Sequence, residues 1–153
     1  MANVSNTSVT PATWNGVYPL KDLKAGDTWT GSFTCCKDGS GSSCVGFASM
    51  VLESTLGCGS ALSIACDFSD ANSVKNAFKN IPNSSKVRFK AKASSTGIHA
   101  IIVASKSDYG ITMYDCNRAD DHKIMCNSMT WANILAKYQG IVNGRAPDKQ
   151  WSL

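Results

Sequence analysis

The sequence predicts an α+β fold in which N-terminal helices pack on an antiparallel β-sheet. The chain has 153 residues, of which 43% are hydrophobic and 17% are charged, so it is long enough to bury one core. Two stretches with helical periodicity, 44–57 and 69–82, occupy its first half, and alternating apolar stretches typical of strands follow. Helices that precede a run of strands are the pattern of an α+β domain.

We expect one folded domain over residues 19–153, preceded by an N-terminal arm over 1–18. No stretch approaches the roughly 18 consecutive apolar residues that a membrane span requires. The N-terminus lacks a basic segment followed by an apolar one, so it does not resemble an intact signal peptide. We therefore expect no membrane span. We also expect the protein to be a monomer.

The first helix is predicted to follow a Gly/Ser-rich loop at 35–43. From Cys44 onward, apolar residues recur with the spacing of a core-facing helix, at positions 44, 47, 48, 51 and 52. Ser42 or Ser43 can cap the start of this helix, and Gly57 is a suitable stop. Cys44 is therefore expected at a helix N-terminus.

The rest of the chain predicts one more early helix and then mostly strands. Residues 69–82 form a short helix that ends at Pro82, after an irregular stretch over 58–69. The expected strands are 86–93, 97–105, 109–117 and 123–130. A closing helix over 131–140 and a last extended segment over 140–147 complete the domain.

The many cysteines and the low charge favour an oxidising, extracytoplasmic setting, so we expect a secreted protein. The seven cysteines are at positions 35, 36, 44, 58, 66, 116 and 126. Seven is odd, so one thiol remains if the other six pair. Zinc fits poorly because there is no CxxC pair, and His99 and His122 do not form a ligand spacing. We expect neither a metal nor another cofactor.

The net charge of +4 is spread along the chain without a dense run. The stretch KVRFKAK at 86–92 alternates basic and apolar residues, which predicts a strand with one solvated face; an anion-binding patch is the alternative. The basic residues lack interleaved aromatic side chains, and no nucleic-acid-binding module is present. We therefore expect no nucleic-acid partner.

The candidate catalytic residues lie on a predicted β-hairpin whose strands flank the sequence KSD. If the turn is centred on Ser107, His99 faces Asp115 across the hairpin. Residues directly opposite in an antiparallel pair share a face, about 5 Å apart at Cβ. Asn117 follows two residues later on that face. This register places an imidazole beside a carboxylate and an amide.

Cys44 at a helix N-terminus, together with such a histidine, predicts a nucleophilic thiol. The helix dipole and an adjacent imidazolium both stabilise a thiolate. His99 would act as base and then acid, while Asp115 or Asn117 would fix its tautomer and orientation. Each residue also has a structural interpretation: Cys44 as a half-cystine or core thiol, His99 as a packed strand residue, and Asp115 as a strand end. The combination favours the catalytic interpretation.

Three motifs carry a family resemblance: Cys-x-Gly-Phe-Ala from position 44, Gly-x-His-Ala-Ile-Ile-Val from 97, and Gly-Ile-Thr-x-Tyr-Asp-Cys-Asn from 110. Over residues 26–147 the chain resembles the papain-like amidohydrolases of the CHAP and NlpC type, in particular secreted CHAP-like domains of Gram-positive gut bacteria. The resemblance implies a papain-like fold with the nucleophile at a helix N-terminus. It implies Cys44 as that nucleophile, His99 as the base, and Asp115 with Asn117 as the orienting residues.

The chain also departs from that family. Ser43 stands where many relatives carry Gln or another polar residue, which leaves the group that completes the oxyanion hole open. Asp115 stands where relatives often carry Glu, and the additional cysteines are not a general feature of the family. Among these cysteines we conjecture two disulfides, Cys116–Cys126 and Cys58–Cys66.

The function that the resemblance implies is a secreted cysteine amidase or endopeptidase. It would hydrolyse amide bonds in the peptide part of bacterial peptidoglycan through an acyl-enzyme. A secreted protease or toxin that acts on protein substrates would use the same residues. A third alternative is a non-catalytic, disulfide-rich domain that binds the cell wall or a partner, in which Cys44 is disulfide-bonded.

Overall fold

The computed structural model describes residues 32–35, 39–42, 44, 47–49, 51–52, 59–92, 98–116 and 123–148, most of which lie in β-strands. The strands are β1 (Ser32–Cys35), β2 (Gly39–Ser42), β3 (Ser60–Leu62), β4 (Cys66–Asp67), β5 (Lys86–Ala91), β6 (Ile98–Lys106), β7 (Gly110–Cys116), β8 (Ile124–Thr130) and β9 (Tyr138–Ala146). The helices with defined bounds are α2 (Ala71–Lys79) and α3 (Trp131–Lys137). Residues 44, 47–49 and 51–52 are also helical.

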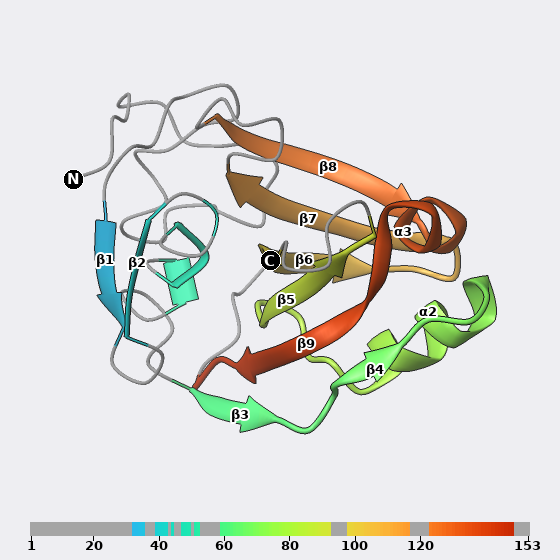
Figure 1. Cartoon of the computed structure of the whole chain (residues 1–153), viewed down its shortest axis with the longest axis horizontal. Helices are drawn as coiled ribbons and strands as arrows, with labels where there is room; N and C mark the ends of the chain where they lie inside the picture. The colour runs from blue at the N-terminus through green and yellow to red at the C-terminus, as the bar shows by residue number, and fades with distance from the viewer. Residues whose placement is uncertain are drawn as a thin grey trace.

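Seven of these strands form one antiparallel sheet, in the order β3-β9-β5-β6-β7-β8, with β4 also paired to β9 (Figure 1). Strands β1 and β2 form a separate antiparallel pair. In Figure 1, β3 and β4 follow the outer edge of β9, and α2 and α3 lie next to each other at one end of the sheet. Two of the catalytic candidates, His99 and Asp115, lie on the central strands β6 and β7.

The expected α+β arrangement, with N-terminal helices packed on a sheet in a papain-like fold, is wrong for the described residues. Strands dominate, and the four short strands β1–β4 all precede α2. The expected loop at 35–43 contains β2, and the expected irregular stretch at 58–69 contains β3 and β4. The fold is better described as a mainly antiparallel β-sheet with a few short helices.

A period-two pattern over residues 60–68 explains part of this error. Its apolar side chains alternate with exposed ones and pack against the core, at Leu62, Ile64, Cys66 and Phe68. Such alternation is typical of a strand with one buried face. We missed it because Cys58 and Gly59 precede the segment and Cys66 lies within it, which suggested an irregular stretch.

The later elements are confirmed to within a few residues. The predicted helix at 69–82 is α2, whose N-cap is Asp70: its carboxylate accepts a 2.7 Å hydrogen bond from the Ser73 N–H. The four predicted strands correspond to β5, β6, β7 and β8, and the closing helix and last extended segment correspond to α3 and β9. The predicted arm at 1–18 lies outside the described residues.

The sheet separates two apolar clusters, one on each face. The helical residues near Cys44 cover one face, in a cluster that contains Phe47, Ala48, Val51, Leu52, Ala100, Ile102, Ala104, Tyr114, Cys116 and Ile124. Helices α2 and α3 cover the other, with Val74, Phe78, Ile81, Trp131 and Ile134 packed on strand residues that include Phe89, Ile101, Val103 and Met113. Even-numbered and odd-numbered residues of β6 thus serve opposite faces through position 103.

The close approach of β4 to β9 gives a test of this topology. A Cβ added at Gly140 would lie 2.1 Å from the carbonyl oxygen of Cys66, so alanine cannot fit unless β4 moves away. We expect Gly140→Ala to lower the free energy of unfolding by about 2 kcal/mol, measured by urea denaturation. The exposed neighbour Gln139 is the control, since Gln139→Ala adds no atoms there. A Gly140→Ala variant as stable as wild type would contradict the pairing of β4 with β9.

Candidate active site

The hairpin of β6 and β7 brings His99 and Asp115 together, but in a different register from the expected one. We expected His99 directly opposite Asp115. In the structure Ile101 is opposite Asp115 and Val103 is opposite Met113, so the pairing is displaced by two residues. Side chains alternate between faces with a period of two, and a displacement of two therefore keeps Asp115 on the same face as His99. The two residues are diagonal neighbours.

The displacement comes from the turn and from a bulge. The turn is centred later than Ser107: the Ser107 N–H donates to the Gly110 carbonyl over 2.9 Å, and Lys106 is opposite Ile111. This turn displaces the pairing by three residues from the expected register. A β-bulge between Val103 and Ser105 reduces the displacement to two residues for the rest of the hairpin. Without that bulge, Asp115 would lie on the opposite face from His99.

His99 and Asp115 form a short, buried hydrogen bond. Nε2 of His99 lies 2.8 Å from Oδ2 of Asp115. The Asp115 side chain is 0% exposed and the His99 side chain is 11% exposed. Burying a carboxylate is costly unless it is paired and hydrogen-bonded, and the imidazole provides such a partner. Because Asp115 holds Nε2, the other ring nitrogen, Nδ1, is the one left to meet a substrate or a thiol.

Cys44, on a helical segment, lies beside the first residues of β6 and close to His99. Its thiol is not in a disulfide and is half-buried, and Sγ approaches the Ile98 carbonyl at 3.8 Å. The Cys44 thiol is also close enough to His99 to interact with its imidazole and raise the imidazole pKa. The helical segment that carries Cys44 packs on the sheet face of Ala100, opposite to that of Ile101 and His99. The Cys44 thiol and the His99 imidazole therefore approach from opposite faces of the sheet. They come together at the first residues of β6.

The charge state of His99 follows from these neighbours. Burial lowers the pKa of His99, but the hydrogen bonds and charge interactions with Asp115 and Cys44 outweigh it and raise the pKa from 6.5 to about 9. At neutral pH the imidazole is protonated, and its charge favours the thiolate form of Cys44. Since this pKa is raised on folding, protonated His99 stabilises the fold fully below pH 6.5, and the stabilisation is lost as the pH rises through about 9.

Tyr138 forms an aromatic wall beside the imidazole that the sequence did not suggest. Its ring is parallel to that of His99, with 2° between planes and 6.2 Å between centroids, and it stacks on Phe89 at 4.3 Å. A parallel ring at this distance favours the protonated imidazole and limits its rotation. We missed Tyr138 because we predicted one helix over 131–140, whereas α3 ends at Lys137 and Tyr138 begins β9.

Two predicted site residues, Ser43 and Asn117, lie outside the described residues. The structure therefore brings together Cys44, His99 and Asp115, and adds Tyr138. Among the residues that the structure describes, no three His, Cys, Asp or Glu side chains gather closely enough to hold a metal ion.

The conjectured disulfides are wrong wherever the structure describes their cysteines. Cys66, Cys116 and Cys126 are not in disulfides, and neither is Cys44. Cys126 is opposite Tyr114 rather than Cys116, because β7 and β8 are offset by two residues from the pairing we assumed. Burial raises the pKa of the Cys66 and Cys126 thiols, which keeps them in the less reactive protonated form.

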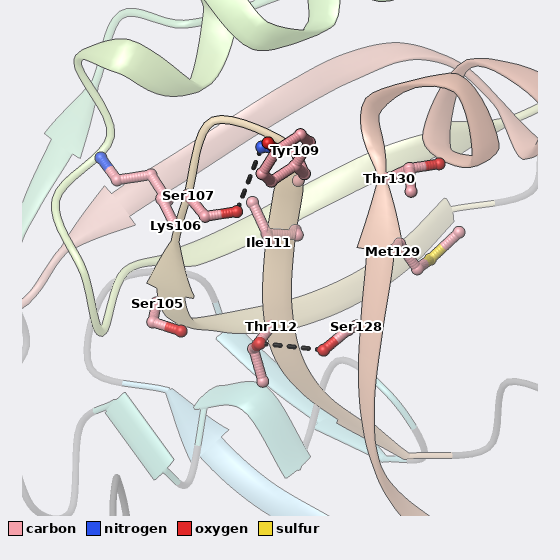
Figure 2. A pocket seen from close by; sticks show the side chains of 10 residues that line it. Ser105, Lys106, Ser107, Tyr109, Ile111, Thr112, Ser128, Met129 and Thr130 are labelled. Atoms are coloured by element: carbon pink, nitrogen blue, oxygen red, sulfur yellow. Dashed lines mark hydrogen bonds between the residues drawn. The ribbon is translucent and has the colours of Figure 1, made fainter.

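A small cavity of about 150 Å³ lies at the opposite end of β6, beside the hairpin turn (Figure 2). Its walls are rich in hydroxyl groups that bond to one another or to the backbone. Thr112 and Ser128 are 3.1 Å apart, and the Ser107 hydroxyl accepts from the Tyr109 N–H over 3.1 Å. It is separate from Cys44 and His99, which lie where β6 begins.

Comparison with known proteins adds no family assignment. No family model matches the chain, and neither curated proteins nor solved structures gave a match. Within the described part of the chain, no helix has the length and apolar character needed to cross a membrane. The resemblance to CHAP and NlpC amidohydrolases therefore rests on the sequence motifs alone.

The ionisation of His99 can be measured directly, because the chain contains only two histidines. We expect an NMR titration to give one imidazole with a pKa near 9, assigned to His99 by comparison with a His122→Gln variant. Asp115→Asn should lower this value substantially, since burial remains while the carboxylate that offsets it is removed. Two histidines that both titrate near 6.5 would contradict the site as described.

Proposed function

We propose that the protein is a cysteine hydrolase that cleaves amide bonds, with Cys44 as its nucleophile. The observation that carries this proposal is the chain of contacts from a half-buried thiol to a buried imidazole, and from that imidazole over 2.8 Å to a fully buried carboxylate. Nucleophile, base and orienting group in hydrogen-bonded sequence are the requirements for covalent acyl transfer.

In the proposed reaction, the Cys44 thiolate attacks the carbonyl carbon of the scissile amide. The resulting oxyanion accepts a hydrogen bond from the Cys44 backbone N–H and from a second donor, for which Ser43 is the neighbouring candidate. His99 then gives its proton to the leaving amine nitrogen as the C–N bond breaks, which leaves a thioester on Cys44. Throughout, Asp115 holds Nε2, so that Nδ1 faces the reacting atoms.

The second half of the reaction releases the acyl group. Neutral His99 takes a proton from a water molecule, whose oxygen attacks the thioester carbonyl. The C–S bond then breaks, the product leaves as a carboxylic acid, and the thiolate and imidazolium are restored. Each turnover consumes one water and produces one amine and one acid.

For the substrate, we propose the peptide part of bacterial peptidoglycan, cut by a secreted enzyme. This step depends on the resemblance of the motifs around positions 44, 97 and 110 to CHAP and NlpC amidohydrolases. A net charge of +4 suits an anionic cell wall but contributes little to the argument. Because Cys44, Cys66, Cys116 and Cys126 are not in disulfides, secretion is proposed from the family resemblance rather than from the cysteine count.

Cys44 is not disulfide-bonded, which favours catalysis over the alternative of a disulfide-rich binding domain. That alternative expected Cys44 to be half of a disulfide. A structural thiol would also gain nothing from a protonated histidine and a buried carboxylate beside it. Binding without catalysis therefore leaves the contacts of His99 unexplained.

The test is digestion of purified peptidoglycan, with released fragments identified by mass. We expect new amine and carboxyl ends from wild type, and a loss of about 100-fold to 10,000-fold in rate for Cys44→Ala and for His99→Gln. Cys66→Ala is the matched control, since it removes another half-buried thiol. Cys66 lies on β4, which is separated from β6 by β9 and β5.

Each result has a defined meaning. A Cys44→Ala variant as active as wild type would refute the nucleophile assignment. No release by wild type would refute the peptidoglycan substrate, and protein substrates would then be assayed with the same variants.

A further inference from the structure

A buried lysine links the helical segment of Cys44 to the sheet. Lys86, the first residue of β5, is 0% exposed, and its Nζ donates a 3.1 Å hydrogen bond to the hydroxyl of Ser49. Ser49 is also fully buried and belongs to the helical segment that carries Cys44. Lysine is almost never fully buried, so its presence here needs an explanation.

The other described contacts of this segment with the sheet are mostly apolar. They involve Phe47, Ala48, Val51 and Leu52, packed on the face of Ala100, Ile102 and Tyr114. Apolar packing has little directional preference and tolerates small shifts of one element over another. A hydrogen bond between Lys86 and Ser49 has a defined length and direction, and so it can fix where the segment lies along the sheet.

We propose that Lys86 is a positioning residue for Cys44, acting through Ser49; the inference rests on the proposed nucleophile. Ser49 follows Cys44 by five residues, or about 7.5 Å along a helix, so Lys86 acts through the helical backbone. On the sheet side, β5 pairs directly with β6, and Phe89 is opposite His99. Lys86 therefore joins the segment of the thiol to the strand that neighbours the imidazole. A displacement of about 1 Å between reacting groups is enough to slow a reaction strongly.

The readout is the rate at which iodoacetamide alkylates Cys44 in the folded protein at neutral pH, followed by peptide mass spectrometry. Loss of the contact with His99 lowers the thiolate fraction and so the rate. We expect Lys86→Met and Ser49→Ala each to slow alkylation by about tenfold, which corresponds to the loss of one buried hydrogen bond. The double variant should be no slower than Lys86→Met, because both substitutions remove the same interaction.

Lys106 provides a matched control at the far end of β6. Its Nζ donates to the carbonyls of Phe78 and Ile81 at the C-terminal end of α2. Lys106→Met should lower the melting temperature and leave the alkylation rate of Cys44 unchanged. Replacing a lysine that only stabilises the fold lowers the melting temperature. Replacing a lysine that positions Cys44 also slows the alkylation of Cys44 in molecules that remain folded.

Three results would overturn the proposal: wild-type alkylation in Lys86→Met, equal slowing in Lys106→Met, or additive losses in the double variant. If Lys86→Met does not fold, Ser49→Ala alone decides, because it keeps the lysine and shortens one side chain on a helix. These results are independent of peptidoglycan digestion. If wild type releases nothing from peptidoglycan while Lys86→Met still slows alkylation of Cys44, the peptidoglycan substrate is refuted and the positioning role of Lys86 is upheld.

Discussion

The structure of the site depends on one interaction, the buried hydrogen bond between His99 and Asp115. A fully buried carboxylate is tolerated only with a partner that compensates for lost hydration, and a protonated imidazole at 2.8 Å is such a partner. The same bond keeps His99 charged although burial opposes it. The charge of His99 in turn favours a thiolate at Cys44, so the acid–base character of the site begins at a residue that substrate never touches.

Strands and helical segments share the work of holding these groups. The central strands β6 and β7 align the imidazole and carboxylate, while β9 contributes the Tyr138 ring that stacks on the imidazole. The thiol comes from the opposite face, on a segment secured by apolar packing and by Lys86. Because the parts of the site arrive from both faces, their alignment depends on the sheet itself, whose central strands are paired to their neighbours along most of their length.

The sequence predicted the proximity of His99 and Asp115 better than the fold around them. His99 and Asp115 were placed together because a period of two is robust: a turn and a bulge that displaced the register by two residues left both on one face. Local pattern could not reveal Tyr138 or Lys86, since their contacts, with His99 and with Ser49, join residues far apart in the sequence. The alternation from Leu62 to Phe68 was visible but was outweighed by neighbouring cysteines. The prediction of two disulfides was wrong because the number of cysteines alone does not show which thiols pair.

The central claim is that charged His99 keeps Cys44 ionised in the folded protein. The most direct measurement is the ultraviolet absorbance of the thiolate, taken as the difference between wild type and Cys44→Ala across the pH range. The ion pair predicts that the Cys44 signal is already present at neutral pH and disappears only on acidification, whereas an ordinary thiol ionises near pH 8.5 or so. A signal that appears only in that ordinary range would contradict the account.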